Sequence, residues 1–63
     1  MQITKLKQAW LSGNPKVFRF KNVCGFVQFC WENKFTPDNS ATAYDEKEDR
    51  MYLVSKEYEN EFN

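Results

Sequence analysis

Two cysteines are the most reactive side chains in this 63-residue chain. Cys24 and Cys30 are separated by five residues, and the chain has no histidine. Two thiols without a histidine fall short of the four Cys or His ligands of a usual zinc site. On a helix, positions six apart are about 9 Å apart along the axis and point about 120° away from each other, which is too far for a disulfide. The sequence therefore predicts free, buried thiols and no metal site.

Sequence motifs of catalysis are also missing. A cysteine nucleophile usually needs a neighbouring base such as histidine, and none is present. The sequence contains no Gly-rich phosphate loop and no Gly-x-Ser-x-Gly elbow. A domain of this size also has little room for a substrate pocket. We therefore expect a protein that is not an enzyme and that uses no cofactor.

Cations and aromatic rings alternate in the stretch from Lys16 to Lys21. Phe18 and Phe20 flank Arg19, an arrangement in which exposed rings stack on bases while cations contact phosphates. The competing interpretation is that both phenylalanines form the buried face of a strand. No RNP-type motif, zinc knuckle or helix-turn-helix pattern accompanies the stretch. Single-stranded nucleic-acid binding is therefore the alternative hypothesis and not the leading one.

Phe29 is the clearest candidate for contact with a partner protein. On a helical wheel that starts at Val23, Phe29 lies about 240° round, opposite the main apolar arc and beside Gly25. A phenylalanine in solvent is costly, so either a partner or another segment of this chain should cover it. We predict that Phe29, with Gln28 and Glu32, forms the helical part of a partner-binding surface.

An acidic run at residues 45–49 supplies a second candidate surface. Asp45, Glu46, Glu48 and Asp49 place four carboxylates within five residues, and such a cluster can dock on a basic protein surface. The run lacks the glycine and the twelve-residue ligand spacing of a calcium-binding hand. We expect Glu46, Glu48 and Asp49 to contact the partner; the alternative is an ordinary solvated turn.

Charge is unevenly distributed along the chain although its sum is zero. Residues 1–35 have six Lys or Arg and one acidic residue, a balance of +5, and the remainder has three against eight, a balance of −5. The two halves either pair across a sheet and cancel, or segregate onto faces that attract different partners. The sequence leaves both alternatives open.

A helix is predicted from about residue 23 to residue 34. Asn22 suits its N-cap, and Thr36-Pro37 follows as a stop, because the residue before a proline is pushed out of helical geometry. One apolar arc is expected to face the rest of the protein. Its members are Val23, Cys24, Phe26, Val27, Cys30 and Trp31.

Strands are expected on both sides of this helix. Residues 17–21 alternate, with Val17 and Arg19 on one side and Phe18 and Phe20 on the other. Residues 41–44 and 50–54 predict a β-hairpin in which Asp45 pairs with Arg50. In that register the further pairs are Tyr44 with Met51, Ala43 with Tyr52, and Thr42 with Leu53.

The two ends of the chain are ambiguous. Ile3, Leu6 and Trp10 fit a helical stripe, but the β-branched start and the turn at residues 12–15 fit a strand, which we prefer. The tail is either a continuing strand or a short helix, and its Phe62 is a candidate cover for Phe29. The predicted fold is a single α+β domain of ββαββ order, with one amphipathic helix on an antiparallel sheet.

These features predict a small cytoplasmic module that binds a larger host or cellular protein as an inhibitor or adaptor. No apolar run approaches the roughly 20 residues of a membrane span, and the start at Met1 lacks the order of a signal peptide. Chains of this size are common among phage and bacterial accessory proteins, and a viral protein of this kind would act in the host cytoplasm. A homodimer that pairs edge strands is compatible with either function.

Overall fold

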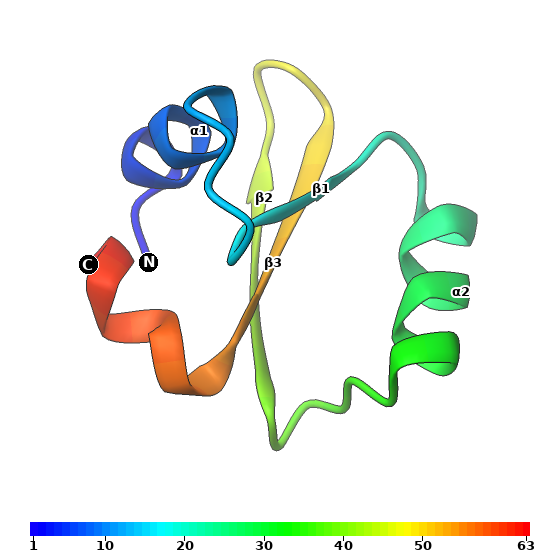
Figure 1. Ribbon diagram of the computed structural model, residues 1–63. Coiled ribbons are helices and arrows are strands. Elements are labelled where there is room, and N and C mark those ends of the chain that lie inside the picture. Colours follow the sequence, from blue (N-terminus) through cyan, green and yellow to red (C-terminus); the bar gives the residue numbers. More distant parts are fainter.

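Three antiparallel strands form the centre of the fold, in the spatial order β1-β3-β2 (Figure 1). The computed structural model describes residues 1–63. In chain order the elements are α1 (Ile3–Leu11), β1 (Phe18–Phe20), α2 (Val23–Asn33), β2 (Ser40–Asp45), β3 (Arg50–Ser55) and the 3₁₀ helix η1 (Lys56–Phe62). The expected α+β class with an antiparallel sheet is confirmed. The ββαββ order with a single helix is wrong, because the chain starts with a second α-helix.

The N-terminal segment forms helix α1 and not the strand that we preferred. Leu6 is fully buried, and Ile3 and Ala9 pack beside it against the core. Most residues after Thr4 in this segment are Lys, Leu, Gln or Ala, which are strong helix formers and outweigh the β-branched start. The turn that follows includes Gly13 at φ +81°, a left-handed conformation that glycine adopts without strain.

The β2–β3 hairpin has the predicted register. Asp45 pairs with Arg50 at its closed end. The other predicted pairs, Tyr44–Met51, Ala43–Tyr52 and Thr42–Leu53, are also present. Oδ1 of Asp45 accepts hydrogen bonds from the backbone N–H groups of Lys47 (3.0 Å) and Glu48 (3.4 Å), which explains why this carboxylate is buried. Asp49 ends the connection at φ +56°.

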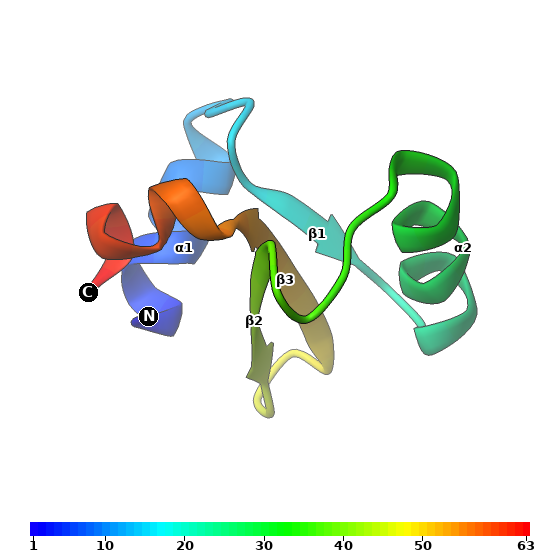
Figure 2. The ribbon, with the colours of Figure 1, turned by 90° about the horizontal axis from the view of Figure 1, so that it is seen from below.

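The hydrophobic core lies on one face of the sheet, between the strands and α1. Leu6, Val17, Tyr52, Val54 and Phe62 make up this core. Helix η1 closes it, so the tail is the short helix of our two alternatives. Figures 1 and 2 show α1 and η1 together on one side of the sheet and α2 on the other. Since Phe62 belongs to the α1 side, it does not cover Phe29.

The two ends of the chain meet on the α1 side of the molecule. The backbone N–H of Gln2 donates a 2.6 Å hydrogen bond to the carbonyl of Phe62. The ammonium group of Lys5 also donates to the carbonyl of Asn63. The N and C labels accordingly lie side by side in Figure 1, far from α2.

The opposite face of β1 joins α2 through aromatic rings. Phe18 and Phe20 project from β1 toward the helix, with ring centroids 4.7 Å and 5.1 Å from that of Phe29. Phe35, just after the helix, stacks on Phe29 at 5.8 Å. This aromatic cluster, which also includes Phe26, attaches α2 to the sheet. The predicted alternation of residues 17–20 is therefore confirmed.

Both ends of α2 have recognisable caps. Asn22 Oδ1 accepts a 2.8 Å hydrogen bond from the N–H of Gly25, so the predicted N-cap is confirmed. Lys34 adopts a left-handed conformation (φ +59°), and the N–H of Phe35 bonds the carbonyl of Cys30 at 2.9 Å. This is the Schellman arrangement that ends many helices. None of the helices is both long and apolar enough to cross a membrane.

Candidate docking groove

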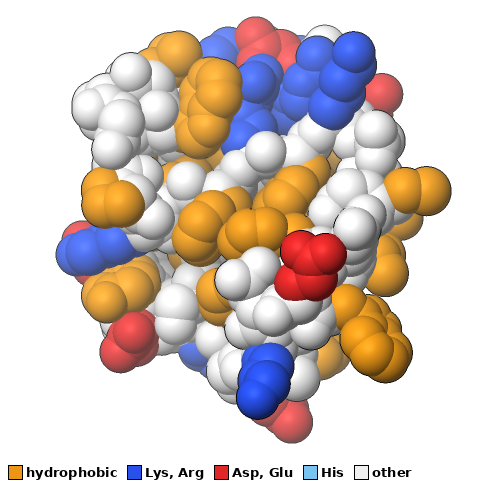
Figure 3. Space-filling view, turned by 45° about the vertical axis from the view of Figure 1, so that its right-hand side comes forward, with side chains coloured by type: hydrophobic (Ala, Val, Ile, Leu, Met, Phe, Trp, Pro, Cys, Tyr) orange, Lys and Arg blue, Asp and Glu red, His pale blue; other side chains and the backbone are white.

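Helix α2 turns only part of its apolar surface toward the sheet. Phe26, Phe29 and Cys30 are half-buried against the β1 side. Val27 is 48% exposed and Trp31 is 84% exposed, although both belong to the arc that we expected to be buried. The helix is therefore rotated about its axis relative to the predicted orientation, and a stripe of apolar side chains is left uncovered. Figure 3 shows hydrophobic side chains protruding along the α2 side of the molecule.

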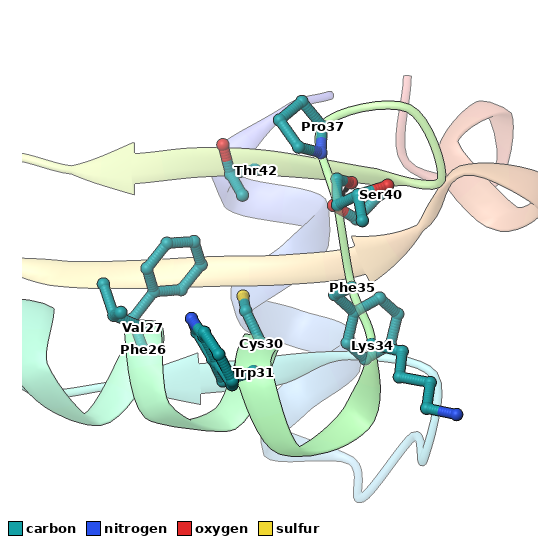
Figure 4. Close-up of a pocket in the computed structure, with 10 residues that line it drawn as sticks. Phe26, Val27, Cys30, Trp31, Lys34, Phe35, Pro37, Ser40 and Thr42 are labelled. Carbon is teal, nitrogen blue, oxygen red and sulfur yellow. Dashed lines mark hydrogen bonds between the residues drawn. The ribbon is translucent and has the colours of Figure 1, made fainter.

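The uncovered stripe forms one wall of an open groove between α2 and β2, with a volume of about 710 Å³. Figure 4 shows Val27, Cys30 and Trp31 projecting from the helix, with Thr42 and Ser40 on the facing strand. The full lining consists of Phe26, Val27, Cys30, Trp31, Lys34, Phe35, Thr36, Pro37, Ser40 and Thr42. The helix supplies an apolar wall, and the strand supplies a hydroxyl-bearing one.

The segment between α2 and β2 is fixed by one amide side chain. Asn39 Oδ1 accepts a 2.8 Å hydrogen bond from the N–H of Thr36, and Asn39 Nδ2 donates a 3.0 Å bond to the carbonyl of Lys34. The hydroxyl of Ser40 also donates to the carbonyl of Thr36, at 2.5 Å. These bonds hold one end of the groove in shape.

The groove has a single charged residue in its lining, Lys34. This lysine takes part in none of the three ion pairs of the protein. Burial raises the pKa of the Cys30 thiol, so this side chain is neutral at physiological pH. The groove therefore has one free positive charge and is otherwise uncharged.

Comparisons with protein-family models, with curated proteins and with solved structures found no match. Function must be inferred from this geometry. No group of three or more His, Cys, Asp or Glu side chains is arranged to hold a metal ion.

Phe29 does not point into solvent, so the premise of its predicted role is wrong. Its ring lies among those of Phe18, Phe20 and Phe35. Gln28 and Glu32, the other two helix residues predicted to bind a partner, are exposed. They are joined by a 3.1 Å hydrogen bond from Gln28 Nε2 to Glu32 Oε1 and do not line the groove.

The acidic run is not a uniform surface of free carboxylates. Glu48 accepts bonds from Lys7 at 2.6 Å and from Arg19 at 3.2 Å, and the Lys7 bond lowers the pKa of Glu48. Asp49 accepts a hydrogen bond from the hydroxyl of Tyr44, which raises the pKa of that tyrosine. Glu46 is exposed and has no hydrogen-bond or ion-pair partner.

The basic stretch is occupied by contacts within the protein. Arg19 has a side chain only 19% exposed, and its guanidinium lies 4.3 Å from the Trp10 ring centroid. Lys16 binds Glu61 at 3.1 Å and lies 4.5 Å from the centre of the Tyr58 ring. Lys21 is exposed. Because Phe18 and Phe20 belong to the aromatic cluster, these residues do not form an exposed platform of rings and cations.

All three ion pairs join the basic half of the chain to the acidic half. They are Lys7–Glu48, Lys16–Glu61 and Arg19–Glu48. The basic and acidic halves of the chain therefore pair with each other at these residues and do not segregate onto separate faces.

Proposed function

We propose that this protein is a small binding module that holds an apolar segment of a larger protein in the groove between α2 and β2. The observation that supports this most directly is Trp31, which is 84% exposed beside the groove. Tryptophan is among the residues most often found at the energetic centre of protein interfaces, because its large ring loses much contact with water on binding. A single exposed aromatic ring is ordinary, but one on the wall of an apolar groove favours docking.

The shape of the groove supports the same proposal. Its volume of about 710 Å³ is within the range of roughly 300 to 1,000 Å³ typical of ligand pockets. Val27 and the more distant Val23 (67% exposed) extend the apolar surface along α2. The hydrogen bonds of Asn39 keep the connecting segment in place before any partner arrives, which lowers the entropy cost of binding.

The chemistry of the lining indicates what the partner segment contains. Apolar side chains would remove Trp31 and Val27 from water, and a carboxylate would complement the free charge of Lys34. A module of this size can occupy a functional segment of its target as an inhibitor, or bring two proteins together as an adaptor. The partner would be a larger protein of the cell or host, encountered in the cytoplasm.

Single-stranded nucleic-acid binding has less support than protein binding. That function needs exposed rings next to free cations, and the cations Lys16 and Arg19 are paired with carboxylates. Lys21 is the one cation of the stretch without an ion pair.

A comparison of two alanine variants tests the proposed function. Immobilised wild-type protein, Trp31→Ala and Leu11→Ala would be exposed to the same lysate, and retained proteins quantified by mass spectrometry. Leu11 is the matched control, because it is an apolar residue 66% exposed on α1, away from the groove. We expect a protein retained by the wild type and by Leu11→Ala but lost with Trp31→Ala. Equal retention by the wild type and both variants would contradict the proposal.

A further inference from the structure

Strand β2 is an edge strand of the sheet. It is bonded to β3 on one side only. Its six residues include no proline and no lysine, and its register with β3 runs without a bulge. Natural proteins commonly use prolines, lysines and bulges to keep an edge strand from pairing with another chain. Their absence leaves the free edge of β2 open to pairing.

The register shows which backbone groups of β2 are free. The N–H of Lys56 donates to the carbonyl of Asn39 at 2.9 Å, and this pair continues the register in which Ser40 is opposite Ser55. In an antiparallel ladder, hydrogen-bonded pairs alternate with pairs that make no bond. Ala41, Ala43 and Asp45 therefore direct their backbone N–H and C=O groups toward β3, like Asn39.

Ser40, Thr42 and Tyr44 alternate with these residues along β2. They direct their backbone N–H and C=O groups toward the free edge. None of the backbone hydrogen bonds that lie outside the helices and strands involves any of the three. Three outward N–H donors and three outward C=O acceptors are thus available to a further strand.

The free edge lies beside the groove. Ser40 and Thr42 line the groove with their side chains, and Tyr44, 49% exposed, projects from the same face because side chains alternate along a strand. A strand added to β2 would place every second side chain on this same face. Those side chains would enter the groove opposite Trp31 and Val27.

We infer that the partner segment binds as an additional strand on β2, with apolar side chains at alternate positions in the groove and a carboxylate beside Lys34. This inference rests on the proposed function and specifies its binding mode. Strand addition is an established way to recognise peptides: backbone bonds supply affinity, and pockets for alternate side chains supply selectivity. The partner is therefore an extended segment and not a helix.

The added strand runs antiparallel to β2. Antiparallel pairing is slightly more stable per residue than parallel pairing. Lys34 and Ser40 lie at the same end of the groove, while Val27 and Thr42 lie toward the other (Figure 4). An antiparallel segment has its C-terminal end beside Ser40, so an acidic side chain near that end, or a terminal carboxylate, meets Lys34.

The test starts from a displayed library of random eight-residue peptides with free carboxyl ends, selected on the immobilised protein. The enriched peptide would be synthesised, and its affinity measured for the wild type and three variants. Thr42→Pro removes one outward N–H but no bond to β3, and proline is tolerated on an edge strand when its missing N–H would face solvent. Trp31→Ala removes the groove wall. Lys34→Gly removes the charge and suits the left-handed backbone at this position.

We expect Thr42→Pro to weaken binding about tenfold, because it removes one hydrogen bond to the peptide and disturbs the bonds on either side of it. Lys34→Gly should weaken binding about two- to fivefold, and an amidated peptide will show whether the terminal carboxylate is the partner of Lys34. Amide hydrogen exchange of the wild type gives a second readout that does not depend on any variant. The bound peptide should slow exchange at residues 40, 42 and 44, with little change at residues 41 and 43, which already bond β3.

Each other result has a defined meaning. Binding that is lost with Trp31→Ala, without protection of residues 40, 42 and 44, would overturn strand addition and leave the docking function intact. A library that yields no peptide sensitive to Trp31→Ala would overturn both. Protection of the same three amides without peptide, rising with protein concentration together with a dimeric mass, would show that a second copy of this chain occupies the edge and would overturn the peptide assignment.

Discussion

Glu48 at the tip of the β2–β3 hairpin accepts a 2.6 Å hydrogen bond from Lys7 of α1, a residue 41 positions earlier in the sequence. The same carboxylate accepts a 3.2 Å bond from Arg19 of β1. Arg19 in turn stacks on Trp10 of α1. One acidic residue thus joins three elements, and the hairpin tip is part of the architecture of the protein and not a free acidic surface.

This arrangement predicts a specific loss of stability in acid. The hydrogen bond from Lys7 lowers the pKa of Glu48 below its ordinary value of 4.5. A pKa that is lower in the folded state gives a stabilisation present above the unfolded value and lost as pH falls through the folded one. Glu48→Gln should therefore melt below the wild type at pH 7, and the difference should shrink as the pH falls through the lowered pKa of Glu48.

Thermal unfolding from pH 7 to pH 3 measures this difference. Glu46→Gln is the matched control, because Glu46 is an exposed carboxylate two residues away without a partner. It should melt like the wild type across the range. A difference between wild type and Glu48→Gln that persists undiminished in acid would mean that the carboxylate charge is not responsible.

Two aromatic residues of α2 should differ strongly in their response to truncation. Phe29 packs among three rings of the aromatic cluster, so Phe29→Ala should lower the free energy of unfolding by about 2 to 3 kcal/mol. Trp31 is 84% exposed, and Trp31→Ala should change the free energy of unfolding by less than about 0.5 kcal/mol. Urea unfolding of both variants measures the contrast. Equal losses would show that Trp31 is packed within the fold.

The C-terminal cap of α2 should be improved by glycine. Lys34 has a φ of +59°, where a side chain is disfavoured. Lys34→Gly should raise the free energy of unfolding by about 0.5 to 1 kcal/mol. Asn33→Gly, one residue earlier and inside the helix, should lower it instead. Chemical denaturation of both variants tests the pair, and a loss of stability in Lys34→Gly would contradict the strain argument.

The hydroxyl of Tyr52 is buried and has no hydrogen-bond partner. Leaving such a group unpaired costs about 1 to 3 kcal/mol. Tyr52→Phe should therefore leave the free energy of unfolding unchanged or raise it. Tyr44→Phe, which removes a hydroxyl bonded to Asp49, should lower it slightly. If calorimetry shows that Tyr52→Phe destabilises the protein by more than about 1 kcal/mol, the hydroxyl has a partner in solution.

Local rules were sufficient to predict the hairpin. The pairing of Asp45 with Arg50 follows from strand alternation and the polar connection between the strands, and every further pair follows from it. The N-cap at Asn22 was similarly predictable from its side chain. Helix α1 was not, because the choice between strand and helix depended on whether Leu6 would find a core beneath it, which only the complete fold decides.

The orientation of α2 could not be read from the sequence for a related reason. Apolar residues cover about 200° of the helical wheel, from Phe29 through Phe26 and Val27 to Trp31. One face of a sheet cannot cover so wide an arc. The rings of β1 take the side that contains Phe29, and the remainder stays open as the groove. An apolar arc wider than one face was the signal in the sequence for a second contact surface.

The hydrogen bond between Gln2 and Phe62 makes the backbone almost a closed ring. Proteins whose ends lie this close tolerate being joined there and reopened elsewhere, or being spliced into a surface loop of another protein. The splice would lie on the α1 side, and the groove beside α2 would remain turned outward (Figure 1). This chain could therefore be inserted into a carrier protein as a binding domain, with both attachment points on the side of the molecule opposite the groove.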